Sequence, residues 1–140
     1  MSVEFLDSNI FIYLFDNVHP HKQAIARDIV RAALEAESGA ISYQVVQETL
    51  KVITTKLAPA LPQHEVHRFL YLTLVPLWHV MPSADLFDRT LVIQARYRFG
   101  FYDSLIVAAA LDAGCTRLYT EDMQHGQQIE SLTITNPFKH

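Results

Sequence analysis

The sequence predicts an α/β fold with a central parallel sheet of four to five strands and helices on both of its faces. Short apolar runs alternate with longer amphipathic stretches along the 140 residues, which is typical of a parallel sheet. Apolar residues make up 50% of the chain, and a chain of this length buries about 68–70% of its surface on folding. We therefore expect one three-layer domain over residues 1–140.

The first half of the chain predicts two strands, each followed by helical spacing. Residues 3–6 form a buried strand. From 21 to 38 apolar positions recur at intervals of three and four, which indicates a helix that ends at Gly39. Residues 40–42 form a brief strand, and a second long helix follows. The expected buried stripes of the two helices are Ile25, Ile29, Ala32, Ala33 and Ala36, then Val45, Val46, Thr49, Leu50 and Ile53.

The second half predicts three more helices and three more strands. A helix over 63–74 leads into a strand over 78–81. Ser83 is the expected N-cap of a helix that runs to Arg98. An alanine-rich helix opens at Asp103 and ends at Gly114, and strands follow over 117–120 and 132–135. The expected packing residues of the Ser83 helix are Leu86, Leu91, Ile93 and Ala95.

Several classes of protein are excluded by what the sequence lacks. A single cysteine, Cys115, forms no internal disulfide and is expected to be a small buried residue. The four glycines are too far apart for a dinucleotide or P-loop motif. No stretch reaches the length of a membrane span, and no signal peptide is expected, so we expect a cytoplasmic protein. His64 and His67 lack the motif and the cysteines of a zinc site, which favours an exposed helix face.

Acidic residues cluster at the edge where the parallel strands end, which is where α/β sheets bind ligands. Asp7 follows the first strand, and Glu121 and Asp122 follow the strand over 117–120. Glu48 lies about two turns into the second long helix, and Asp103 begins a later helix. Each acid alone has an ordinary interpretation as a helix cap, a turn residue or a solvated helix face.

Carboxylates gathered at one edge repel one another and need a cation to neutralise them. Carboxylate oxygens suit Mg²⁺ or Mn²⁺, which also bind phosphate oxygens. Such an ion activates a bound water for displacement at phosphorus, so the sequence predicts metal-assisted phosphodiester hydrolysis. The net charge of -4 agrees with an empty metal site of four acids. Without those four, the remaining 11 carboxylates equal the 11 lysines and arginines in number.

Four segments together resemble a known family: residues 5–13, the helix around Glu48, residues 102–106 and residues 118–126. In this order and spacing they resemble the PIN domain family. Within this family the motifs are most similar to those of the VapC group, the toxin ribonucleases of type II toxin–antitoxin pairs. The resemblance implies a PIN-like three-layer α/β/α fold and an endoribonuclease that depends on Mg²⁺ or Mn²⁺. It also implies a homodimer held inactive by an antitoxin.

The resemblance assigns the four acidic positions of the family to Asp7, Glu48, Asp103 and Asp122, as metal ligands and catalytic residues. Asn9 matches a small polar position that helps to orient the site. The last acid is ambiguous, because the adjacent Glu121 is a candidate for a direct or supporting ligand.

Other functions compete with this interpretation. A haloacid dehalogenase type phosphatase places a second aspartate where this chain has Asn9, and a receiver domain needs an acidic pair and a lysine that are not evident. The main alternative is a non-catalytic PIN-like module that binds RNA or a partner protein. The sequence leaves open which RNA is cleaved and where, the identity of the antitoxin, and whether one or two metal ions bind.

Overall fold

The computed structural model describes residues 3–139, so residues 1, 2 and 140 of the predicted domain lie outside its described part. Its sheet has six strands in the order β3-β2-β1-β4-β6-β5. Five strands run parallel, as the sequence predicts, and the two-residue β5 pairs antiparallel with β6. The strands are β1 (Glu4–Leu6), β2 (Gly39–Ser42), β3 (Trp78–Val80), β4 (Arg117–Tyr119), β5 (Gln128–Ile129) and β6 (Leu132–Thr135).

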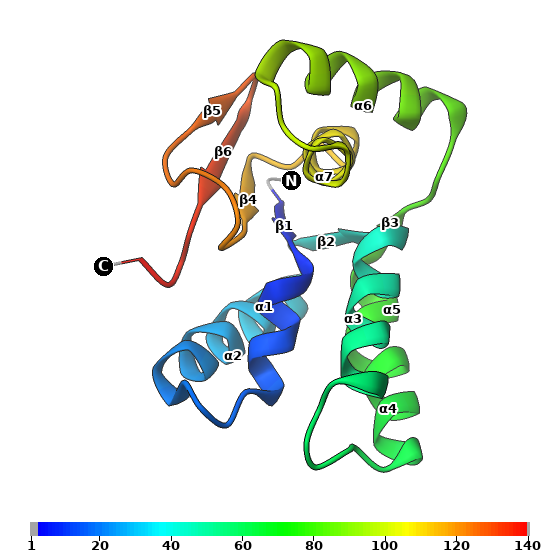
Figure 1. The fold of residues 1–140 in the computed structure, drawn as a ribbon, viewed down its shortest axis with the longest axis vertical. Coiled ribbons are helices and arrows are strands. Elements are labelled where there is room, and N and C mark those ends of the chain that lie inside the picture. Colours follow the sequence, from blue (N-terminus) through cyan, green and yellow to red (C-terminus); the bar gives the residue numbers. More distant parts are fainter. Residues whose placement is uncertain (1–2, 140) are drawn as a thin grey trace.

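Helices cover both faces of the sheet, which confirms the α/β class with three layers. Figure 1 shows α6 and α7 on one face and the helices from α1 to α5 on the other. Within residues 3–139 no helix has the length and apolar content needed to cross a membrane. The helical elements are α1 (Ser8–Ile12), the 3₁₀ turn η1 (Tyr13–Phe15), α2 (Pro20–Glu35), α3 (Tyr43–Thr55), α4 (Gln63–Phe69), the π-helical turn η2 (Leu70–Leu74), α5 (Val75–Leu77), α6 (Ala84–Tyr97) and α7 (Phe101–Asp112).

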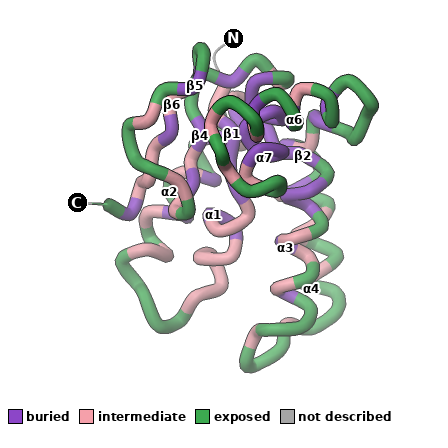
Figure 2. The backbone as a smooth tube through the Cα atoms, turned by 45° about the horizontal axis from the view of Figure 1, so that its top comes forward, coloured by how far each residue is buried: buried purple, intermediate pink, exposed green. Residues whose placement is uncertain are grey.

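The core occupies both faces of the sheet, and α7 is its most completely buried helix. Every residue from Ser104 to Leu111 is buried, because α7 packs between the sheet and α6 and is apolar on all sides. Figure 2 shows buried backbone along β1, β4, β2 and α7, whereas much of α4 and α6 is exposed. Cys115 is buried at 1% exposure, as expected, and burial raises the pKa of its thiol to about 12.

The register of the sheet brings two chain segments to the same edge. Leu6, the last residue of β1, is level with Tyr119, the last residue of β4. The backbone N–H of Asp7 donates to the carbonyl of Tyr119 at 3.0 Å, which extends this pairing by one residue. The residues that follow both strands therefore meet, as expected for a parallel sheet.

The role predicted for Gly39 as the end of a helix is wrong. Helix α2 already ends at Glu35, and the residue with positive φ that follows it is Glu37. Gly39 is the first residue of β2. A Cβ at this position would lie 2.7 Å from Cβ of Ala33 and 2.9 Å from Cδ2 of Leu77. Glycine is needed here because α2 and α5 pack closely against the strand.

The predicted buried stripes are correct for α3 and partly wrong for α2 and α6. On α3 four of the five predicted stripe residues are buried, and the fifth, Leu50, is half-buried. On α2 and α6 the face that meets the core is rotated, so that Ala26, Val30 and Thr90 are buried instead. Helical spacing alone leaves this rotation open, because apolar residues also lie beside the stripe. The predicted packing residues that are exposed are Ala32, Ala36, Leu91 and Ala95.

Candidate metal centre

Asp7 lies at the centre of the edge where β1 and β4 end. It is the N-cap of α1, and its Oδ1 accepts from the backbone N–H of Ser8 at 2.7 Å. Its Oδ2 accepts from the hydroxyl of Thr120 at 2.8 Å. The helix-cap interpretation of Asp7 is therefore correct, but it accounts for only one carboxylate oxygen. The side chain is 5% exposed, which is unusual for a carboxylate without a cationic partner.

The protonation of Asp7 reflects this environment. Burial, with smaller contributions from the negative charges of Glu48 and Asp122, raises the pKa of its carboxyl to about 7. The hydrogen bonds from Thr120 and Ser8 oppose this rise because they stabilise the charged form. A carboxylate in such surroundings is well suited to bind a cation, which would remove the cost of its charge.

Glu48 reaches the same place from α3. Its Oε1 accepts from the hydroxyl of Ser8 at 3.1 Å, and its Oε2 accepts from Nε2 of Gln44 at 3.2 Å. Ser8, which directly follows Asp7, therefore links the two acids: its backbone N–H donates to Asp7 and its hydroxyl donates to Glu48. The expected alternative of a freely solvated helix face does not apply, since Glu48 is half-buried and hydrogen-bonded.

Asp103 belongs to α7, but it does not open the helix as predicted. The helix begins at Phe101 with Gly100 as its N-cap, so Asp103 lies in the first turn. Burial raises the pKa of Asp103, and the charges of Asp122 and Glu48 add to the rise. The helix-cap interpretation of Asp103 is thus wrong. The charges of Glu48 and Asp122 raise the pKa of Asp103, as they raise that of Asp7.

Asp122 is held by the two segments that meet at the sheet edge. Its carboxylate accepts from Nδ2 of Asn9 at 3.1 Å, and its backbone N–H donates to the hydroxyl of Thr120 at 3.1 Å. Asn9 also accepts from the backbone N–H of Glu121 at 3.4 Å through Oδ1. Asn9 therefore orients the loop after β4 as well as the Asp122 carboxylate, which suits the supporting role expected of it.

Glu121 points to a different set of partners. Its carboxylate accepts from Nζ of Lys22 at 2.7 Å and from the hydroxyl of Tyr13 at 2.6 Å. Burial opposes ionisation, but these hydrogen bonds from Lys22 and Tyr13 bring the pKa of Glu121 below its usual range. Lys22 neutralises its charge, whereas within residues 3–139 no lysine or arginine forms an ion pair with the four acids above.

Thr120 is a site residue that the sequence analysis missed. Its side chain is fully buried, and its hydroxyl bridges Asp7 and the backbone of Asp122. Nδ2 of Asn9 also approaches this hydroxyl, at 3.4 Å. The available signal was the position of Thr120, a polar residue between a buried strand and two acids.

Glu48 and Asp122 thus lie close enough to Asp7 and to Asp103 to raise the pKa of both, although the four predicted acids come from four separate segments. Within residues 3–139 no group of three or more His, Cys, Asp or Glu side chains is arranged to hold a metal ion. The donor set nevertheless fits Mg²⁺ or Mn²⁺. Mg²⁺ binds oxygen ligands only, and it commonly takes one or two carboxylates and keeps several waters.

Comparison with known families agrees with this architecture. The PIN domain family matches residues 5–127, a stretch that includes all four acids. The chain belongs to the PIN domain family. A comparison with curated proteins gives no match.

Solved structures share the fold of this PIN domain at low sequence identity. A toxin–antitoxin complex from Klebsiella pneumoniae aligns with a TM-score of 0.68 and 21% identity, over 99% of this chain and 100% of the other. VapC20 from Mycobacterium tuberculosis, described as a sarcin–ricin loop cleaving toxin, aligns with a TM-score of 0.60 and 17% identity, over 85% and 89%. FitAcB from Neisseria gonorrhoeae aligns with a TM-score of 0.61 and 17% identity, over 96% and 98%.

Proposed function

We propose that this PIN domain is an endoribonuclease that depends on Mg²⁺ or Mn²⁺. The observation that carries the proposal is the arrangement of Asp7, which is buried, faces two further acids and has no cationic partner among the described residues. A protein that only binds RNA gains nothing from such a group, because each uncompensated carboxylate lowers stability and repels phosphate.

The residues divide the chemical work as follows. Asp7 and Asp103 would hold the cation directly, and Asp122 would bind it directly or through water. Glu48, fixed by Ser8 and Gln44, would orient the attacking water and accept its proton. When bound, the cation lowers the pKa of water and neutralises charge on the phosphate. Asn9 and Thr120 position these ligands.

A cleavage assay tests the proposal. Purified protein is incubated with single-stranded RNA in Mg²⁺ or Mn²⁺, in EDTA, and in EDTA followed by excess metal. We expect cleavage within the RNA chain only when free metal is present, and none from Asp7→Asn. Equal cleavage by wild type and Asp7→Asn would overturn the assignment of the site.

Metal-dependent stability separates a nuclease from the alternative of a non-catalytic module. Mn²⁺ should raise the melting temperature of the wild type, because binding to the folded state stabilises it. Asp7→Asn should abolish this rise, whereas Asp88→Asn, on an exposed position of α6, should keep it. A melting temperature that does not respond to Mn²⁺ would favour the module.

We further propose that the enzyme is the toxin of a type II toxin–antitoxin pair in the cytoplasm. The fold similarity to toxins supports this proposal. Expression of the protein should arrest growth, and Asp7→Asn should remove the effect. Co-expression of a small neighbouring reading frame should restore growth, and failure of every neighbouring gene to do so would favour a free-standing nuclease.

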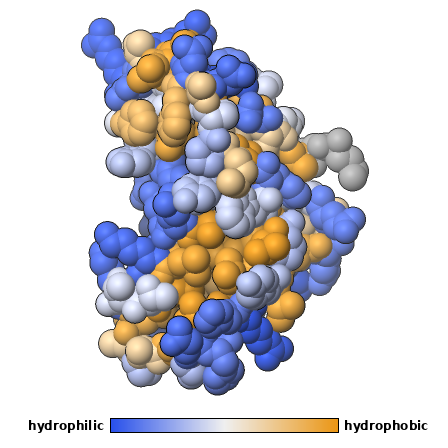
Figure 3. Space-filling model, turned by 90° about the vertical axis from the view of Figure 1, so that its right-hand side faces the viewer, coloured by the Kyte–Doolittle hydropathy of each residue, from blue (hydrophilic) through white to orange (hydrophobic). Residues whose placement is uncertain are grey.

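The protein has exposed apolar surface of the kind that binds other proteins, and the proposed toxin role requires such partners. Figure 3 shows apolar side chains gathered on the half of the molecule formed by α3, α4 and α5, where Leu72 and Val75 are exposed. We propose that such surface serves the homodimer and the antitoxin. Sedimentation of the purified protein tests the dimer, which a purely monomeric profile would contradict.

A further inference from the structure

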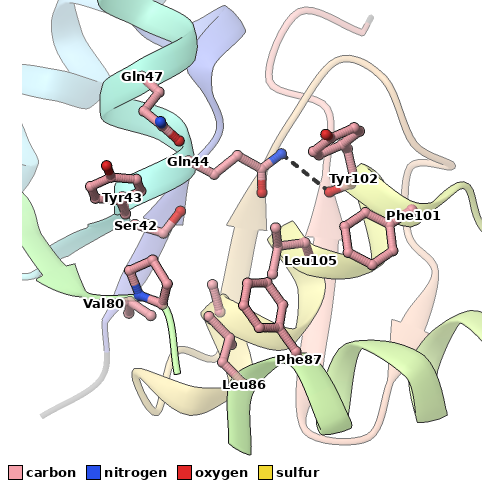
Figure 4. A pocket seen from close by; sticks show the side chains of 12 residues that line it. Ser42, Tyr43, Gln44, Gln47, Val80, Leu86, Phe87, Phe101, Tyr102 and Leu105 are labelled. Carbon is pink, nitrogen blue, oxygen red and sulfur yellow. Dashed lines mark hydrogen bonds between the residues drawn. The ribbon is translucent and has the colours of Figure 1, made fainter. Parts of the chain in front are cut away.

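A cavity of about 340 Å³ lies beside the acidic cluster, between the start of α3, the start of α7 and α6. Its walls are mainly apolar and aromatic. Figure 4 shows the rings of Phe87 and Phe101 together with Leu105 around this space. Several of the rings reach the surface, since Phe87 is 41% exposed, Phe101 is 37% exposed and Tyr102 is 66% exposed.

Gln44 connects this cavity to the candidate metal centre. Its Nε2 donates to the carboxylate of Glu48 at 3.2 Å and to the carbonyl of Tyr102 at 3.3 Å. Tyr102 directly precedes Asp103. The cavity is therefore connected to Glu48 by one hydrogen bond of Gln44, and its lining residue Tyr102 is the chain neighbour of Asp103.

The same two hydrogen bonds fix the orientation of the Gln44 amide. Both partners accept hydrogen bonds only, so the NH₂ group must face them and Oε1 must face the other way. Figure 4 shows Oε1 pointing into the cavity. Gln44 is 8% exposed, and no donor among the described residues reaches its Oε1. A buried acceptor without a donor is costly, so a ligand that brings an N–H group there gains binding energy.

The walls and the acceptor together specify the ligand. Aromatic walls favour a flat ring, and Oε1 requires a donor at the edge of that ring. The ligand part must also be uncharged. An anion would be repelled by Glu48 and Asp103, and a cation would lose its hydration against apolar walls.

We propose that this cavity, named here the Gln44 cavity, binds one unpaired nucleobase of the RNA substrate next to the phosphate that is cleaved. The inference rests on the proposed ribonuclease activity, because RNA places a flat, uncharged, N–H-bearing ring next to each phosphate. Proteins hold single-stranded RNA in this manner, with aromatic side chains against the base faces. Oε1 itself has less than 1 Å² of accessible surface, so the base reaches it only after a side chain of the cavity wall shifts.

Binding of free nucleosides tests the cavity without any cleavage. Adenosine, guanosine, cytidine and uridine, each at millimolar concentration, are added to ¹⁵N-labelled protein in EDTA, with ribose as the control. The Gln44 side-chain NH₂ group reports from the cavity wall. Trp78, the single tryptophan, reports through Tyr43, whose ring lies 6.0 Å from it and lines the cavity. We expect saturable shifts of these signals with at least one nucleoside and none with ribose.

Kinetics of two variants on the same helix test the role of the cavity in catalysis. Phe87→Ala removes a wall of the cavity, and Leu91→Ala truncates another exposed apolar residue of α6 that does not line it. Loss of one stacking contact should raise KM of Phe87→Ala about tenfold with little change in kcat. Leu91→Ala should keep both constants.

The outcomes separate this inference from the proposed function. RNA cleavage with no nucleoside shift and an unchanged KM in Phe87→Ala would overturn the base site and leave the nuclease standing. Nucleoside binding without any RNA cleavage would support the cavity and contradict the nuclease. If both variants raise KM and the Gln44 signals change only with protein concentration, a second copy of the chain covers the cavity, and the base site is overturned.

Discussion

The hydroxyl of Thr120 donates to Oδ2 of Asp7 at 2.8 Å and accepts the backbone N–H of Asp122 at 3.1 Å. This one buried side chain, directly after β4, thus fixes Asp7 and Asp122, which are 115 residues apart in the sequence. Replacement of a residue that orients metal ligands in this way typically lowers metal affinity or activity by roughly 10- to 100-fold.

Replacement of this hydroxyl should impair the metal centre. In Thr120→Val, Asp7 loses a donor and the Asp122 backbone loses an acceptor, while the size of the side chain is kept. We expect metal affinity or cleavage rate to fall about 10- to 100-fold. Thr120→Ser keeps the hydroxyl and should retain most of the activity. Mn²⁺ titrations of the cleavage rate measure both effects, and equal behaviour of the valine and serine variants would contradict the role given to the hydroxyl.

The protonation of Asp7 predicts how the stability of the metal-free protein depends on pH. Its pKa is about 7 in the folded protein, against about 3.9 in an unfolded chain. Between these values the folded state binds more protons than the unfolded state, so the free energy of unfolding falls as pH rises from 4 to 7. The raised pKa of Asp103 acts in the same direction.

Asp7→Asn should remove the contribution of Asp7 to this pH dependence. Urea unfolding in EDTA at pH 5 and pH 8 measures it, because the difference between wild type and variant cancels most other titrating groups. From pH 5 to pH 8 the variant should gain up to about 2.6 kcal/mol on the wild type, because about two pH units of the Asp7 titration lie in this range. The account of Asp7 fails if the wild type loses no stability relative to the variant.

The adjacent acids Glu121 and Asp122 should differ sharply in function. Glu121 is paired with Lys22 at 2.7 Å, and their side chains are 27% and 31% exposed. Glu121→Gln should therefore cost less than about 1 kcal/mol of stability and leave cleavage intact. Asp122→Asn should lose metal-dependent cleavage while it stays folded. Comparison of cleavage rates and circular dichroism for the pair checks this, and loss of cleavage in Glu121→Gln would place that residue in the metal centre.

Local signals in the sequence predicted much of the fold. Ser83 caps α6 through its hydroxyl at 3.1 Å from the backbone N of Leu86, as predicted, and the five parallel strands lie at the predicted positions. Gly114 has φ of +73° just after α7, which agrees with its predicted place at the helix end. Such features depend on neighbouring residues in the chain, so the sequence displays them directly.

Features that depend on contacts between distant segments were missed. The function of Thr120 depends on Asp7, which reaches it only across the sheet. Helical spacing assigns Gly39 to a helix end, whereas its close packing against Ala33 and Leu77 is evident only in the folded structure. The separation of Glu121 from the other acids follows from Lys22 on α2, which no spacing in the sequence relates to it.

The central claim is that acids from four segments form one metal-dependent nuclease site. Its most direct test is the rate of single-stranded RNA cleavage in Mn²⁺ by wild type, Asp103→Asn and Asp88→Asn, purified in the same way. We expect wild type and Asp88→Asn to cleave at the same rate and to stop in EDTA, and Asp103→Asn to stay inactive while folded. Cleavage by Asp103→Asn at the wild-type rate would contradict the claim.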